Sequence, residues 1–188
     1  MPTLDQQREA FKRQRFIATP IAGMIAWLAI GIGSLFLSLQ NTVYLLFGAT
    51  GTIVYLGMFI SRFTGENFLD KSKPKNAFDT LFFYTVAMAM AVYSIAIPFF
   101  FVEPTSLPLS VGILSGLMWI PISWMIEHWV GIFHTVVRTV AILVLYYLFP
   151  EHRFFYIPLA IVAIYVVSIW ILERRYQTMR AQKELSSV

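Results

Sequence analysis

The chain has 188 residues, of which 58% are hydrophobic and only 13% are charged. Ordinary soluble domains are roughly 45–50% apolar and about 25% charged, and a soluble protein of this size could not bury so much apolar surface. The absence of cysteine excludes thiolate metal sites, a disulfide scaffold and cysteine nucleophiles. The net charge of +4 lies in short clusters beside apolar stretches, which indicates membrane topology and not nucleic-acid binding.

Apolar stretches long enough to cross a bilayer follow one another along the chain, and crossing takes about 20 helical residues. The first run is longer than a signal-peptide core, so we interpret it as a retained span. The pattern predicts an all-α, polytopic transmembrane helical bundle of about six spans, forming a single integral membrane domain. The predicted spans are residues 20–39, 42–60, 77–102, 107–125, 126–149 and 155–172.

Local signals support several of these boundaries. Thr19 and Pro20 suit the N-cap and first position of the first helix. Asn76 with Asp79 three residues later resembles a capping box for the third helix. Pro98 is expected to kink that helix near its far end.

The boundary between the fourth and fifth spans has the weakest signal. Residues 107–149 form an almost continuous apolar stretch, too long for one span but about right for two. Three tryptophans near its middle, Trp119, Trp124 and Trp129, fit an interfacial aromatic belt, and Pro121 can loosen the helix before a turn. Five spans, or a re-entrant segment at this point, remain the alternatives.

Basic residues predict the orientation. The N-terminal segment, the loop at residues 61–76 and the tail at residues 173–188 each carry four Lys or Arg, whereas the opposite side carries only Arg153. Positively charged loops stay on the cytoplasmic side. Both termini and the long loop are therefore expected in the cytoplasm.

Two motifs resemble a known family. The stretch ISRFTGENFLDK at residues 60–71, followed by Pro74, and the later element Pro121-Ile122-Ser123-Trp124 resemble an uncharacterised, domain-of-unknown-function family of small multi-span bacterial membrane proteins. The resemblance implies a multi-pass protein of the bacterial cytoplasmic (inner) membrane. It implies no activity.

The fifth predicted span has a polar face. At about 100° per residue, Glu127, His134 and Arg138 fall on one side of this helix. Arg138 would lie about 16 Å from Glu127 along the axis, near mid-membrane, where an arginine costs at least about 2.5–3.5 kcal/mol. The face predicts a pathway for an ion, a proton or another small solute. The alternative is an interhelical contact, with Arg138 bonded to backbone carbonyls or to a hydroxyl such as that of Ser94, Ser115 or Thr139.

Gly112 and Gly116 form a small-xxx-small motif in the fourth span, which lets two helix backbones approach closely. The motif predicts either packing within the chain or a homodimer face.

Function is less constrained than fold. The polar face favours a small transporter or channel in contact with the lipid bilayer. The alternative is a non-catalytic component that self-associates, as a homodimer, or assembles with a partner membrane protein. An enzyme acting on lipid is the third hypothesis, with Glu127 and His128 as the acid–base pair. The histidine spacing gives no metal-binding motif, so neither a metal nor a cofactor is expected.

Overall fold

The computed structural model describes every residue except 1, 67, 69–75 and 186–188, so most of the basic part of the predicted loop at residues 61–76 lies outside the described residues. The described part is helical, without strands. Its α-helices and short 3-10 helices (η) are α1 (Leu4–Lys12), α2 (Ala18–Gly33), α3 (Leu39–Thr64), α4 (Ala77–Ala91), α5 (Tyr93–Val102), η1 (Pro104–Ser106), α6 (Leu107–Gly116), α7 (Trp119–Met125), α8 (Val130–Leu148), η2 (Pro150–His152) and α9 (Arg153–Leu185).

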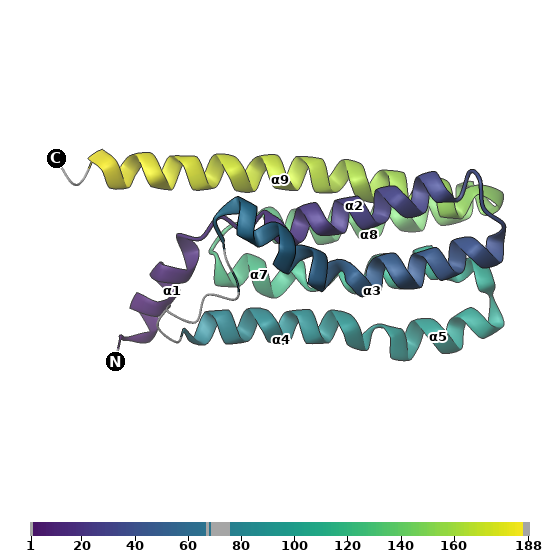
Figure 1. Ribbon diagram of the computed structural model, residues 1–188, viewed down its shortest axis with the longest axis horizontal. Coiled ribbons are helices and arrows are strands. Elements are labelled where there is room, and N and C mark those ends of the chain that lie inside the picture. The colour runs from purple at the N-terminus through teal and green to yellow at the C-terminus, as the bar shows by residue number, and fades with distance from the viewer. Residues whose placement is uncertain (1, 67, 69–75, 186–188) are drawn as a thin grey trace.

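The predicted helical membrane bundle is confirmed. Five described helical stretches are long and apolar enough to cross a membrane: Leu39–Thr64, Ala77–Val102, Pro104–Met125, Val130–Leu148 and Pro150–Gln182. A sixth apolar helix, α2, has 16 residues and lies against α3 and α9. The helices run along one long axis, and the two ends of the chain lie at the same end of the bundle (Figure 1).

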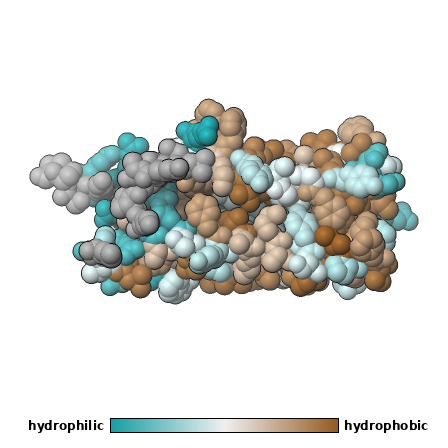
Figure 2. Space-filling model, turned by 60° about the horizontal axis from the view of Figure 1, so that its bottom comes forward, coloured by the Kyte–Doolittle hydropathy of each residue, from teal (hydrophilic) through white to brown (hydrophobic). Residues whose placement is uncertain are grey.

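Apolar side chains cover the middle of the bundle, as a membrane protein requires. In Figure 2 they spread across the face formed by its lower helices, while hydrophilic side chains gather at the end that carries α1. Large exposed apolar side chains on the long helices include Tyr55, Phe63 and Phe101. Since lipid is as apolar as these side chains, their exposure carries no penalty in a bilayer. The chain is a multi-pass membrane protein.

The two ends of α3 follow the expected chemistry, whereas the start of α2 does not. The hydroxyl of Ser38 accepts from the backbone N–H of Asn41 at the start of α3, and Gly65 ends α3 in the left-handed conformation (φ 78°). Thr19 does not cap α2, because that helix begins at Ala18. The cap comes from another part of the chain, as described below.

The predicted break between the fourth and fifth spans lies slightly later than expected. Helix α7 ends at Met125 and α8 begins at Val130, so residues 126–129 form a turn between them. The backbone carbonyl of Ser123 accepts from the N–H of His128, which closes this turn. Helix α9 also continues to Leu185, beyond the predicted end of the last span at residue 172.

The third predicted span is broken and not merely bent. Helices α4 and α5 meet at Val92, and Pro98 lies inside α5.

At the N-terminus of α4, the Asn76 side chain accepts from the backbone N–H of Phe78, as a cap should. Asp79, however, accepts from Gln14, just after α1, instead of forming a capping box.

Packing is unequal around the bundle. Helices α2, α3, α8 and α9 pack closely, and α6 joins them through α8 and α9. Helix α4 instead packs on α1, α6 and α7, and it shares little contact with α3. This arrangement leaves space between α3 and α4.

Candidate functional site

A polar network lies inside the bundle, centred on α8. His134 and Arg138 are one turn apart on this helix and are 0% and 1% exposed. They face α6 and α9, the two helices that supply their partners. Nδ1 of His134 lies 2.9 Å from the Ser168 hydroxyl. The Arg138 guanidinium donates to the hydroxyls of Tyr165 (3.3 Å) and Ser115 (3.1 Å).

The arginine determines the tautomer of the histidine. An Arg138 nitrogen lies 3.3 Å from Nε2 of His134. Because a guanidinium can only donate, Nε2 must accept and carries no proton. The imidazole is therefore neutral, and its Nδ1–H donates to Ser168, whose own hydroxyl donates to the Ile164 carbonyl.

Aromatic rings enclose the two side chains. The Trp119 ring stacks on the His134 ring at 4.0 Å with an interplanar angle of 11°. The Arg138 guanidinium lies 5.5 Å from the ring centres of Trp27 and Tyr165. Such contacts stabilise a desolvated cation by about 2 kcal/mol or more.

Glu127 does not share this face. It lies in the turn before α8, its φ is 50°, and its side chain is 46% exposed. One carboxylate oxygen contacts Arg8 (2.9 Å) and the other contacts Lys12 (2.6 Å), both on α1. The sequence-based placement assumed that the fifth helix already includes residue 127. The turn directs this side chain to the polar end of the bundle instead.

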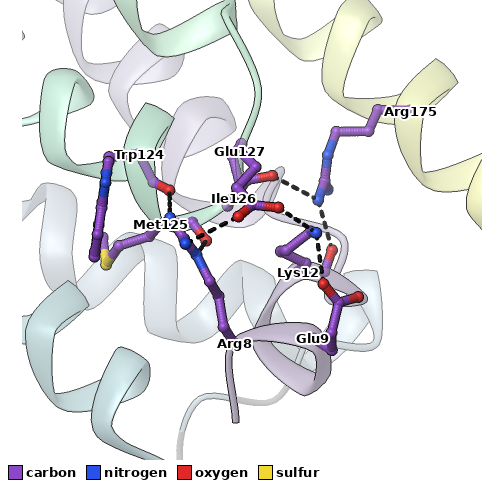
Figure 3. A network of polar contacts seen from close by, with 8 residues as sticks. All are labelled: Arg8, Glu9, Lys12, Trp124, Met125, Ile126, Glu127 and Arg175. Carbon is purple, nitrogen blue, oxygen red and sulfur yellow. Dashed lines mark hydrogen bonds and ion pairs between the residues drawn. The ribbon is translucent and has the colours of Figure 1, made fainter. Parts of the chain in front are cut away.

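A second network therefore joins α1 to the α7–α8 turn (Figure 3). Arg8 donates to the backbone carbonyl of Trp124 at 2.5 Å, and its guanidinium carbon lies 4.2 Å from the centre of the Trp124 ring. Arg175, from α9, donates to the carbonyls of Lys12 (2.8 Å) and Ile126 (3.4 Å). The hydrogen bond from Lys12 lowers the pKa of Glu127, and the nearby charge of Arg8 adds to this effect. Sequence analysis missed this network because it interpreted Arg8 and Lys12 only as topology charges.

Gly112 and Gly116 both face the interior of this chain. A Cβ at Gly112 would lie 2.8 Å from Ile142, and one at Gly116 would lie 3.1 Å from Cδ of Arg138. Their small size makes room for α8 and for the arginine. A homodimer formed through Gly112 and Gly116 stays a prediction, because both glycines pack against side chains of the same chain.

A cavity of about 100 Å³ lies beside the buried network, between α3 and α4. Its side walls include Ile53 and Met58 of α3 and Val86 and Ala89 of α4. A single water needs about 10–15 Å³ measured this way, so the cavity has room for a short chain of heavy atoms.

Two aromatic pairs include residues that line this cavity. The Phe47 and Tyr93 rings lie 5.9 Å apart at one end, where the hydroxyls of Thr50 and Tyr93 also form a hydrogen bond. The Phe68 and Phe82 rings lie 5.9 Å apart at the other. Two lining side chains of α4, Phe83 and Met90, are each 42% exposed, so the cavity reaches the surface of the bundle on this side.

Glu66 lines the α1 end of the cavity and caps α2. One carboxylate oxygen accepts from the backbone N–H groups of Ile17 (3.0 Å) and Ala18 (2.9 Å). A carboxylate is favourable at a helix N-terminus because of the free N–H groups and the helix dipole. Burial nevertheless raises the pKa of Glu66 above its ordinary value. The sequence signal for this cap was absent, because donor and acceptor are almost 50 residues apart.

Among the described residues, no group of three or more His, Asp and Glu side chains could hold a metal ion. His128 accepts from the Val130 N–H through Nδ1.

Comparisons with known proteins identify a family but no characterised relative. The profile of DUF7010, a family of unknown function, matches residues 4–175. This confirms the resemblance to an uncharacterised family that the two motifs indicated. No curated protein and no solved structure matches the chain.

Proposed function

The chain belongs to the DUF7010 family, a family of unknown function, and we propose that it takes a small lipophilic molecule from the bilayer into the cavity between α3 and α4. The observation that carries this proposal is the exposure of lining side chains on the apolar surface of α4. Phe83 and Met90 line the cavity and are each 42% exposed, so they form its rim. An apolar site that reaches the surface of a membrane-spanning helix suits a ligand that is already dissolved in the membrane.

We further propose that the protein acts as a carrier and not as a water-filled channel. The predicted pathway residues His134 and Arg138 are buried and bonded to neighbouring helices. Movement along their face would require helices to separate. A carrier fits this closed arrangement, because it exposes its site by such a rearrangement.

The proposed setting is the bacterial inner membrane, with both termini cytoplasmic. This orientation rests on the excess of Lys and Arg in the N-terminal segment, the long loop and the tail. The cavity end that contains Glu66 then lies toward the cytoplasm, and the end that contains Thr50 lies deeper in the membrane.

The first test is ligand binding by purified protein in lipid nanodiscs. A bromine-tailed fatty alcohol should quench the fluorescence of Trp27 and Trp119, which line the cavity. Replacing the exposed Trp124, Trp129 and Trp170 by Phe removes the signal from tryptophans in contact with bulk lipid. Saturable quenching that excess unbrominated alcohol reverses would support the proposal. Quenching that rises linearly with probe would refute it.

A pair of alanines on α4 provides a matched control. Ala89→Phe should fill the cavity and abolish saturable quenching, because Ala89 lines it. Ala87→Phe adds the same ring at an exposed position outside the lining and should leave quenching unchanged. Equal effects of both variants would contradict a site between α3 and α4.

Self-association is the second candidate function, favoured by the outer face of α3. A Cβ at Gly48 or at Gly51 would meet nothing within 4 Å. Because small residues allow close helix approach, this face could receive a second copy. The mass of the detergent-solubilised protein by light scattering tests it: a dimer that Gly48→Leu converts to a monomer would support it, and a monomeric parent protein would refute it.

A further inference from the structure

The charge of Arg138 indicates which headgroup the cavity receives. Its partners are all neutral: His134, Tyr165 and Ser115. Within the described residues no carboxylate forms an ion pair with it, and its Nε has no hydrogen-bond acceptor. A buried cation compensated only by dipoles and ring faces is costly, and a negative charge nearby would offset that cost.

Only one layer of side chains separates this cation from the cavity. Three residues that contact the guanidinium, Trp27, Ser115 and Tyr165, also line the cavity. They come from α2, α6 and α9, so the cation lies behind a wall built by three helices.

The Tyr165 hydroxyl can transmit the charge. Its oxygen accepts a hydrogen bond from Arg138. Among the described residues, no acceptor takes the hydrogen of the Tyr165 hydroxyl itself. A hydroxyl that accepts from a cation becomes a stronger donor. An anionic oxygen in the cavity would be a suitable acceptor.

We propose that the cavity binds a single-chain amphiphile with an anionic headgroup, a carboxylate or a phosphate, at the hydroxyl of Tyr165. The Ser115 hydroxyl donates to the Val111 carbonyl and accepts from Arg138, so it holds the guanidinium and has no hydrogen for the headgroup. This assignment rests on the proposed function and adds the substrate class to it. The headgroup is held near Arg138, and the chain leaves laterally past Phe83 and Met90. A cationic headgroup would be repelled by the arginine, and a neutral one would gain only the hydrogen bonds.

Glu66 does not oppose this binding mode. It follows the end of α3 at Thr64 and lines the α1 end of the cavity. Its charge is also held against the N-terminus of α2.

The test compares chain-matched probes in the nanodisc assay at alkaline pH: bromine-tailed undecanoate, undecanol, undecylamine and undecyl phosphate. We expect at least one anionic probe to bind about tenfold more tightly than the alcohol, and the amine to bind most weakly. A preference for one anion identifies the headgroup as carboxylate or phosphate. Equal binding of alcohol and anions would overturn the headgroup assignment while leaving the proposed function intact. Absence of saturable binding by any probe would refute both.

Variants separate the headgroup site from the apolar cavity. Tyr165→Phe and Arg138→Gln should each abolish the preference for the anion, and Arg138→Gln should leave alcohol binding within about twofold. Tyr147→Phe, at an exposed tyrosine of α8, should change neither. Should Arg138→Gln fail to fold, Tyr165→Phe decides: a retained anion preference in this variant would overturn the assignment.

Discussion

Arg138 donates to Nε2 of His134 one helical turn away, and this single contact fixes the imidazole as the neutral tautomer that donates to Ser168. The chain of donors thus runs from a permanent cation on α8 to a carbonyl on α9. Removing one member leaves a buried donor without an acceptor, and such a donor costs about 1–3 kcal/mol.

Ser168→Ala should therefore lower thermal stability, because Nδ1–H of His134 loses its acceptor. The expected cost of about 1–3 kcal/mol can be measured as a lower melting temperature of the purified protein in detergent. Thr178→Ala, on the exposed part of α9, removes a hydroxyl that bonds only within its own helix and should change stability little. Equal melting temperatures for parent and Ser168→Ala would contradict the assigned hydrogen bond.

Two glycines should respond to substitution by alanine in opposite ways. At Gly131 an added Cβ would lie 2.1 Å from the Trp119 carbonyl oxygen, so α7 and α8 would be forced apart. Gly131→Ala should cost about 1–3 kcal/mol or more. At Gly48 nothing lies within 4 Å, and alanine should be neutral or stabilise the helix by up to about 1 kcal/mol. Melting curves of both variants would check the difference, and a stable Gly131→Ala protein would contradict the close packing of α7 on α8.

The face of α8 that carries His134 and Arg138 could be predicted from helical periodicity, but the position of Glu127 could not. A continuous apolar stretch hides where a helix ends, and here the glutamate itself lies in a turn closed by Ser123, before the helix that carries the other two residues. The partners of the arginine come from α6 and α9, more than 20 residues away in sequence. Ser115 was an expected candidate, whereas Tyr165 carried no local signal.

The lateral cavity also had no signal in the sequence. It exists because α4 packs on α6 and α7 and not on α3, which is a property of the tertiary arrangement. The apolar pattern of either helix is equally compatible with lipid contact and with cavity walls, since both environments favour the same residues.

The contact between α1 and the α7–α8 turn should depend on pH. The pKa of Glu127 is lowered in the folded protein, so its ion pairs stabilise the docked state above the ordinary carboxyl pKa of 4.5. This contribution is lost as the pH falls through the lowered value, and Glu127→Gln should remove it at every pH. Spin labels on cysteines at Asp5 and Ala181 should give a narrow distance distribution near neutral pH in the parent. The distribution should broaden in acid and in Glu127→Gln.

Glu9→Gln is the matched control for this measurement. Glu9 contacts Lys12 only within α1, three residues away, so its loss should leave the distribution narrow. A distribution that does not broaden in Glu127→Gln would mean that the other contacts of α1 are enough to hold it, among them the burial of Phe11 and the hydrogen bond from Arg175 to the Lys12 carbonyl.

Orientation can be tested with single cysteines, because the chain has none of its own. Cysteines at Asp5 and Gln40 lie at exposed positions at opposite ends of the bundle. A membrane-impermeant maleimide should label the Asp5 variant only in inverted vesicles and the Gln40 variant only in intact cells, as the distribution of Lys and Arg requires. A cysteine at Ala22, fully buried in α2, should be labelled from neither side. The reverse pattern for the first two variants would overturn the orientation, and with it the assignment of the Glu66 end of the cavity to the cytoplasm.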